Sequence, residues 1–306
     1  MKPRVIVLTD ISSMKAGVLE PDDTQSMVRF LLTSDEFDVE GLIASAYGKY
    51  GTRPEYIHQL IDAYALDYPN LIKYSSGYMP PEKLHSLVKK GSNRPGDYRI
   101  GEKCDTEASN WIIKCADKND ERPLWILLWC GALDLAQAVW RAKNSKSAED
   151  FERFKSKLRI YSIGDQYDNT GKMIKENYPE IFYITNYNAF RGMYRGGDES
   201  LSGKEWAEHN IVGKGHLGSM YPVYDGGDPW GKVHGIKEGD TPSFLYLLYN
   251  EDPENPTKES CGGSFIKCGK NQYRDSEDIE TARESVYKWR KEFQEDFKRR
   301  LDRCRV

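Results

Sequence analysis

Short apolar runs alternate with segments of helical periodicity along most of the chain. Residues 5–8 form a β-branched run, and residues 27–32 then carry apolar side chains at helical spacing. Similar strand-like runs occur at 39–45, 123–129, 158–164 and 181–185. Helical spacing returns at 56–68, 106–118 and 133–140. This alternation predicts an α/β fold with a Rossmann-like, mostly parallel sheet flanked by helices.

No repeat, low-complexity tract or linker divides the chain, so we expect a single domain over residues 1–306. Pro242 suits the first turn of a helix that Asp240 or Thr241 can cap. A long amphipathic pattern at about 276–303, with Trp289 and Phe293 on its apolar side, predicts one terminal helix.

Composition narrows the function classes. A net charge of −4 argues against a nonspecific binder of nucleic acid or of membrane surfaces, which needs a basic face. No apolar run is long enough to span a membrane. The six cysteines contain no Cys-x-x-Cys pair, and the first strand begins without a leader, which favours reduced thiols in a cytoplasm. Export remains the alternative if a signal peptide was trimmed, and Cys261 could then pair with Cys268.

Polar or glycine-rich tips follow four of the predicted strands. Asp10, Trp129, Asp165 and Asn186 mark these tips in chain order. Open α/β sheets bind their ligands at the carboxyl ends of the strands, so we expect the tips to converge in one crevice. Asp165 or Gln166 would contact substrate hydroxyls there, and the alternative is an Asx-type turn that opens the next helix.

Acidic residues gather after the first strand, at Asp10, Glu20, Asp22 and Asp23. Carboxylates so close together repel one another unless a proton or a cation relieves them. Ca²⁺ is a hard ion that prefers oxygen ligands, so it suits such a loop. The alternative is that Asp22 and Asp23 only stabilise the start of the following helix through its dipole.

Three segments carry a family resemblance. Residues 9–11, Thr-Asp-Ile, and residues 20–29, Glu-Pro-Asp-Asp-Thr-Gln-Ser-Met-Val-Arg, resemble the first strand and Asp-rich loop of the nucleoside hydrolases. They look closer still to the nucleoside hydrolase-like family first noted in cellulose-binding proteins of marine bacteria. Residues 238–244, Glu-Gly-Asp-Thr-Pro-Ser-Phe, resemble the late signature of that family. The resemblance implies the nucleoside hydrolase-like fold.

The resemblance also implies an activity, the metal-dependent hydrolysis of an N- or O-glycosidic bond with Ca²⁺ as cofactor. Asp10 would take the proton of the attacking water, and Asp22 would accept a sugar hydroxyl, so both are catalytic candidates. Asp10, Asp23 and Asp240 would bind the metal together with the backbone carbonyl of Trp129. The expected ligand is a small sugar or nucleoside, and a homo-oligomer is possible because such assemblies are common among nucleoside hydrolases.

Substrate contacts are expected from Asp22, Asp165, Asn186 and Glu238. His216 is a further candidate, together with His234, because nucleoside hydrolases place a histidine near the leaving base. This chain has Gly239 at the position of that histidine.

Two departures from the hydrolase pattern leave a second function open. Nucleoside hydrolases have two Asp residues before the loop, whereas this chain has only Asp10, and Gly239 replaces the late histidine. The alternative is therefore a carbohydrate-binding module that retains the metal site without efficient catalysis.

Overall fold

The computed structural model describes residues 1–14, 21–45, 51–93, 99–166, 169–226 and 233–305, and Glu20 of the acidic loop lies outside them. The strands of the main sheet are β1 Arg4–Thr9, β2 Asp38–Ala44, β3 Val88–Lys90, β4 Leu124–Leu128, β5 Leu158–Ile163, β6 Phe182–Asn186, β9 Ile266–Lys267 and β10 Gln272–Arg274. A separate hairpin joins β7 Tyr224–Asp225 and β8 His234–Gly235.

The α-helices are α1 Pro21–Thr33, α2 Pro54–Leu71, α3 Pro81–Leu87, α4 Glu107–Ala116, α5 Leu133–Ser145, α6 Ala148–Lys157, α7 Thr170–Asn177, α8 Lys204–Asn210, α9 Gly215–Ser219, α10 Pro242–Leu248, α11 Ile279–Tyr287 and α12 Arg290–Asp302. The short 3₁₀ helices are η1 Ser34–Glu36, η2 Ala189–Met193 and η3 Glu199–Leu201.

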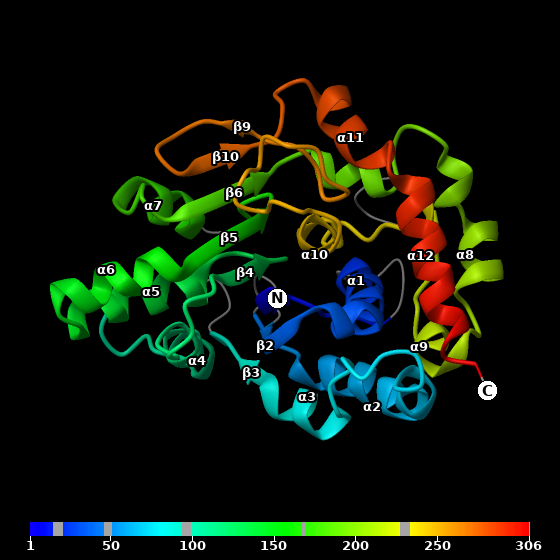
Figure 1. Cartoon of the computed structure of the whole chain (residues 1–306), viewed down its shortest axis with the longest axis horizontal. Coiled ribbons are helices and arrows are strands. Elements are labelled where there is room, and N and C mark those ends of the chain that lie inside the picture. The colour runs from blue at the N-terminus through cyan, green and yellow to red at the C-terminus, as the bar shows by residue number, and fades with distance from the viewer. Residues whose placement is uncertain (15–20, 46–50, 94–98, 167–168, 227–232, 306) are drawn as a thin grey trace.

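An eight-stranded sheet forms the centre of the molecule (Figure 1), in the order β3-β2-β1-β4-β5-β6-β10-β9. Every neighbouring pair is parallel except β10 with β9. The prediction of an α/β fold with a mostly parallel sheet flanked by helices is therefore confirmed.

Side chains of β1 alternate between two hydrophobic cores, because successive residues of a strand point to opposite faces of the sheet. Val5 and Val7 pack with helices that include α1, α2 and α10. Ile6 and Leu8 pack with α4, α5 and α6 on the other face. Burial of each such side chain contributes about 1.5–3 kcal/mol. The central strands are thus held from both sides, which fixes the position of their carboxyl ends.

The strand order reverses between β1 and β4. From β1 the sheet continues through β2 and β3 in one direction, and from β4 through β5 and β6 in the other. Leu8 is level with Leu128, and the N–H of Trp129 donates to the carbonyl of Leu8 at 2.9 Å. The residues that follow these two strands therefore emerge side by side, at the switch point where open α/β sheets bind ligands.

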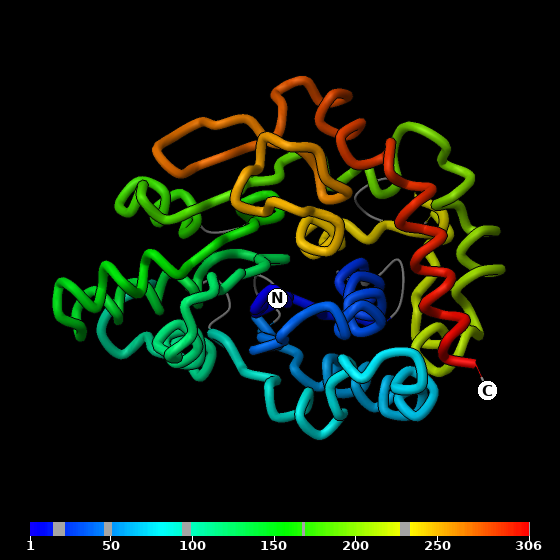
Figure 2. Tube along the Cα trace, in the orientation of Figure 1, coloured from blue at the N-terminus to red at the C-terminus, as the bar shows by residue number. Residues whose placement is uncertain are grey.

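The carboxyl-terminal segment contains two helices, so the prediction of one helix over 276–303 is wrong. α11 ends at Tyr287, and α12 begins at Arg290 and packs beside α1 and α9 (Figure 2). Arg290 is fully buried at the break between them. Its guanidinium donates to the carbonyls of Gly192, Arg195, Gly196 and Asp198.

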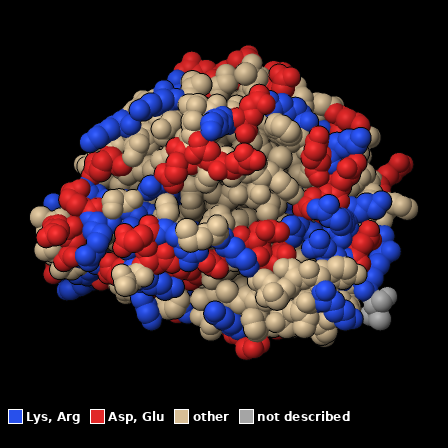
Figure 3. All heavy atoms as spheres, in the orientation of Figure 1, with Lys and Arg blue, Asp and Glu red and all other residues tan. Residues whose placement is uncertain are grey.

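Charges of both signs are mixed across the surface drawn in Figure 3. None of the helices formed by the described residues combines the length and the apolar character that crossing a bilayer requires.

Candidate active site

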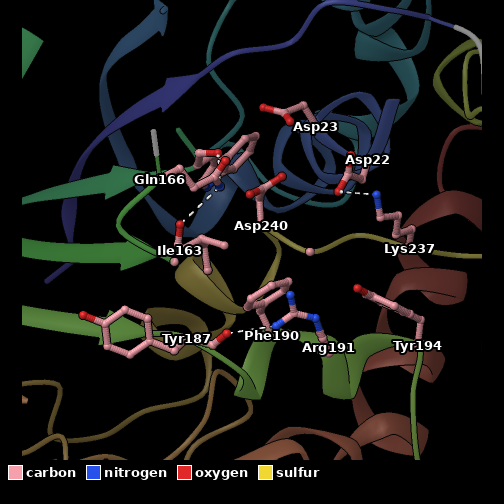
Figure 4. Close-up of a pocket in the computed structure, with 13 residues that line it drawn as sticks. Asp22, Asp23, Ile163, Gln166, Tyr187, Phe190, Arg191, Tyr194, Lys237 and Asp240 are labelled. Atoms are coloured by element: carbon pink, nitrogen blue, oxygen red, sulfur yellow. Dashed lines mark hydrogen bonds and ion pairs between the residues drawn. The ribbon is translucent and has the colours of Figure 1, made fainter. Parts of the chain in front are cut away.

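A cavity of about 380 Å³ lies at the carboxyl edge of the sheet, where β1, β4, β5 and β6 end (Figure 4). The described residues that line it are Asp22, Asp23, Trp129, Ile163, Gly164, Gln166, Tyr187, Phe190, Arg191, Tyr194, Lys237, Gly239 and Asp240. A volume of this size suits a small ligand.

Five residues that the sequence proposes for the site line this cavity, and one of them is Gln166, the alternative to Asp165. Asp22 and Asp23 belong to the first turn of α1, Trp129 follows β4, and Asp240 precedes α10. The structure thus brings together three segments that are more than 100 residues apart in the chain.

Asp10 lies behind the cavity instead of lining it. It follows β1 directly and is buried. Burial, and then the negative charges of Asp10 and Asp23, raise the pKa of the Cys130 thiol well above its ordinary value. Both carboxylates therefore lie near Cys130, and a thiol held protonated in this way is not a nucleophile.

Asp22 and Asp23 form the most strongly charged part of the cavity. Burial, and then the charge of Asp22, raise the pKa of Asp23 well above its usual range, although the Thr9 hydroxyl donates to Asp23 and Lys237 opposes the shift. Asp22 Oδ2 lies 3.6 Å from Nζ of Lys237. Within the described ranges, no donor reaches the buried Oδ1 of Asp22. Both features favour a bound cation.

Hydrogen bonds connect Asp240 to the end of β4. The indole N–H of Trp129 donates to Oγ of Ser243 at 2.7 Å, and the Ser243 hydroxyl donates to the carbonyl of Asp240 at 2.7 Å. Pro242 occupies the first turn of α10, as predicted. These contacts fix the backbone of Asp240, and its side chain faces the cavity (Figure 4).

Gln166 contacts the backbone carbonyl that the resemblance assigns to the metal. Its Nε2 donates to the carbonyl of Trp129 at 3.1 Å and to that of Ile163 at 3.2 Å. A carbonyl oxygen has two lone pairs, so the carbonyl of Trp129 can accept this bond and still contact a further ligand.

Asp165 does not line the cavity, whereas Gln166, the alternative named for the same substrate contact, does. Gly164 and Asp165 both have positive φ values, +78° and +47°, and Gln166 follows this turn into the cavity. The carboxylate of Asp165 accepts from the Tyr183 hydroxyl at 2.6 Å and pairs with Lys175. These donors direct Asp165 toward α7.

Asn186 also lies outside the lining, contrary to the expectation of a substrate contact. It is fully buried at the end of β6. Its Nδ2 donates to the Tyr161 hydroxyl at 2.9 Å, and its Oδ1 accepts from the N–H of Phe190 at 2.8 Å. Asn186 therefore positions Phe190, which does line the cavity.

Glu238 is fully buried and lies outside the lining, so the expected substrate contact is not found. Its carboxylate accepts from Arg29 Nε at 2.6 Å and from the hydroxyls of Tyr221 at 2.6 Å and Thr241 at 2.8 Å. The carboxylate joins α1 to the segment before α10, which is a structural role.

The two histidine candidates lie elsewhere. His216 belongs to α9, and both its backbone N–H and its Nδ1 contact Asp67 of α2 at 2.9 Å. His234 is exposed on β8. Neither is among the described residues that line the cavity.

Gly239 leaves space where the hydrolases carry a histidine. A Cβ atom at this position would lie 3.3 Å from the Phe190 ring and 3.4 Å from Oδ2 of Asp22. A side chain at residue 239 would therefore crowd the cavity beside Asp22.

The sequence did not predict a further part of the described lining, which consists of Tyr187, Phe190, Arg191, Tyr194 and Lys237. Tyr187, Phe190 and Arg191 lie across the cavity from Asp22 and Asp23 in Figure 4, whereas Lys237 lies beside Asp22. Burial raises the pKa of Tyr194, while the nearby charges of Lys237 and Arg191 oppose this shift. Residues 187–194 follow the end of β6 directly. This position at the end of a strand was the feature of the sequence from which they could have been predicted to line the site.

The chemical type of the donor atoms in the cavity suits a calcium ion. They are the carboxylates of Asp22, Asp23 and Asp240 and the carbonyl of Trp129, all of them hard oxygens. The raised pKa of Asp23 points the same way, because a cation relieves a strained carboxylate. Among the residues described, however, no three His, Cys, Asp or Glu side chains form a group that could hold a metal ion as they stand.

The strand order and the acidic cavity at the switch point define an open α/β protein with a candidate ligand site at the carboxyl edge of its sheet. Residues 4–265 match the family described as "Cellulose-binding Sde182, nucleoside hydrolase-like domain", and the chain belongs to this family.

Solved structures agree with this assignment. A nucleoside hydrolase-related hypothetical protein from Saccharophagus degradans, associated with carbohydrate metabolism, is similar with a TM-score of 0.82 and 30% identity. The match covers 99% of this chain and 72% of that one. The effector protein XOO4466 shares the fold, with a TM-score of 0.52 and 10% identity over 100% of this chain and 95% of its own. No protein with a curated description matches the chain.

Proposed function

We propose that the protein hydrolyses an N- or O-glycosidic bond of a small sugar or nucleoside, with Ca²⁺ as cofactor. The observation that carries this proposal is the grouping of Asp22, Asp23 and Asp240 on one cavity at the switch point of the sheet. Family membership supports the same class of activity, and the Saccharophagus degradans relative's association with carbohydrate metabolism supports a sugar substrate.

Each carboxylate has a proposed role. Asp23 and Asp240, with the carbonyl of Trp129 and with Asp10 behind them, would hold the ion. When bound, Ca²⁺ would polarise a sugar hydroxyl and a water molecule. Asp10 is the proposed acceptor of the water's proton, following the family resemblance.

Asp22 is the proposed acceptor of a sugar hydroxyl, and Lys237 compensates its charge from 3.6 Å. Cleavage of a glycosidic bond passes through an oxocarbenium-like state, whose positive charge the carboxylates of the cavity would stabilise.

Calorimetry with Ca²⁺, followed by hydrolysis assays on a panel of nucleosides and glycosides, tests this proposal. Asp23→Asn and Asp240→Asn should each weaken Ca²⁺ binding at least about tenfold, because each removes a charged ligand. Asp10→Asn should lower turnover by about 10²–10⁴-fold while sugar affinity is kept. Asp225→Asn, at an exposed strand position, is the matched control and should change neither quantity.

A carbohydrate-binding role without efficient catalysis is the second candidate. It is favoured because the described residues offer no ready-made metal group, and no histidine among them lines the cavity. Sugar binding that is unaccompanied by turnover, with the metal site retained, would establish this role instead.

A further inference from the structure

Arg191 is a charged group of the cavity that the proposed reaction does not use. Among the described residues, two cationic side chains line the cavity, Arg191 and Lys237. Lys237 faces Asp22 at 3.6 Å. Arg191 forms no ion pair with any acidic side chain in the described part of the chain, so its charge is not compensated by the protein there.

The guanidinium of Arg191 is nevertheless held in place. Its Nη1 donates to the carbonyl of Tyr187 at 2.9 Å, and its Cζ lies over the Phe190 ring, 4.4 Å from the centroid (Figure 4). Phe190 is itself fixed through its N–H, which donates to Asn186 at 2.8 Å. A side chain that is already oriented loses less freedom when a ligand binds.

Most donors of this guanidinium are unused. Arginine carries five N–H groups, and contacts with the described residues engage only the one on Nη1. The planar edge formed by Nε and Nη2 matches the two oxygens of a carboxylate or a phosphate. Tyr187 and Phe190 beside it offer ring surfaces for the apolar parts of a sugar.

We propose that Arg191 binds an anionic group of the substrate, a carboxylate or a phosphate, and thereby selects anionic sugars over neutral ones. This inference rests on the proposed function, because it assigns a substrate class to the same cavity. The carboxylates on the opposite wall would repel such a group, so it binds at the Arg191 side while the sugar hydroxyls face Asp22 and Asp240.

Equilibrium binding of matched sugar pairs tests the proposal. Glucuronate is compared with glucose, and ribose 5-phosphate with ribose, by calorimetry or ligand-observed NMR. A chelator is present because a carboxylate or phosphate could otherwise be attracted by Ca²⁺ itself. We expect the anionic member of at least one pair to bind about tenfold more tightly or better. The pair that shows the preference identifies the group as a carboxylate or a phosphate.

Three variants test whether the preference for anionic sugars depends on Arg191. Arg191→Gln should abolish it, and Arg191→Lys should keep only part of it, because lysine retains the charge but lacks the fork. Arg195→Gln is the matched control, four residues further along and outside the cavity lining, and should keep the full preference. Circular dichroism and melting curves confirm that each variant is folded.

Two results would overturn the inference: no preference for the anionic member in either pair, or a preference that Arg191→Gln leaves intact. The hydrolase proposal fails separately. An Arg191-dependent preference without turnover of any glycoside would support the anion site and contradict the proposed hydrolase activity. Turnover of neutral glycosides without any preference for anionic sugars would support the hydrolase activity and contradict the anion site.

Discussion

Glu238 illustrates, at the scale of a single residue, how a buried charge is tied to stability. Its carboxylate faces Arg29 inside the protein, and both side chains are almost completely buried. Glu238→Gln keeps the shape but leaves the Arg29 cation without its counter-charge. We expect the free energy of unfolding to fall by about 3–5 kcal/mol, measured by urea denaturation.

Glu251→Gln, at an exposed position, is the control and should change stability by less than about 0.5 kcal/mol. If Glu238→Gln kept full stability but lost sugar binding, Glu238 would contact the substrate after all.

Glu238 and the other acidic residues show what the sequence can and cannot predict about the site. The order of strands and loops was enough to place Asp22 and Asp23 at the carboxyl edge of the sheet, whereas Asp240 was predicted from the family resemblance. That order was not enough to orient Asp165 or Glu238. Their directions depend on a positive φ value and on donors from distant elements, neither of which leaves a local pattern.

At the scale of elements, α12 is anchored by a buried ion pair that makes stability depend on pH. Burial alone would raise the pKa of Asp296, but the charge of Arg300 at 2.7 Å and the Tyr249 hydroxyl outweigh it and hold the pKa below its ordinary value. Such a carboxylate stabilises the fold above its unfolded-state pKa, near 3.9, and the contribution is lost as pH falls through the lower folded-state value.

We therefore expect the free energy of unfolding to decrease as pH is lowered from about 5. Asp296→Asn should lose about 2 kcal/mol at neutral pH, less than for an isolated pair because Arg300 keeps Asp35 as a partner. Urea denaturation between pH 3 and pH 7 measures both effects. Glu295→Gln, exposed on the same helix, should follow the parent curve, and an Asp296→Asn curve of unchanged slope would contradict the assignment.

The break between α11 and α12 has no cause in the local sequence. The helical periodicity continues through Lys288 and Trp289, and no glycine or proline interrupts it. What distinguishes this point is the set of carbonyls that Arg290 contacts almost 100 residues earlier in the chain. Long-range hydrogen bonds of this kind are invisible to periodicity, whereas the amphipathic face itself was predictable.

At the scale of the whole molecule, the cavity joins parts of the chain that unfolding would separate. Asp23 belongs to α1, Trp129 follows β4, and Asp240 precedes α10. An ion that binds these groups only in the folded state must stabilise the entire fold. At a Ca²⁺ concentration about 100 times the dissociation constant, the gain is about 2.7 kcal/mol. For a chain of this length, that corresponds to a rise in melting temperature of about 4 °C.

Differential scanning calorimetry with and without Ca²⁺ measures this rise. Mg²⁺ should produce a smaller shift, because it demands octahedral geometry and gives up its water reluctantly, whereas Ca²⁺ tolerates irregular oxygen cages. The shift should disappear in Asp23→Asn and persist in Asp225→Asn, whose side chain is exposed and outside the lining. A melting temperature that millimolar Ca²⁺ leaves unchanged would remove the ion from the mechanism. The acidic cavity would then have to bind its sugar through hydrogen bonds alone, which is the chemistry of a binding protein.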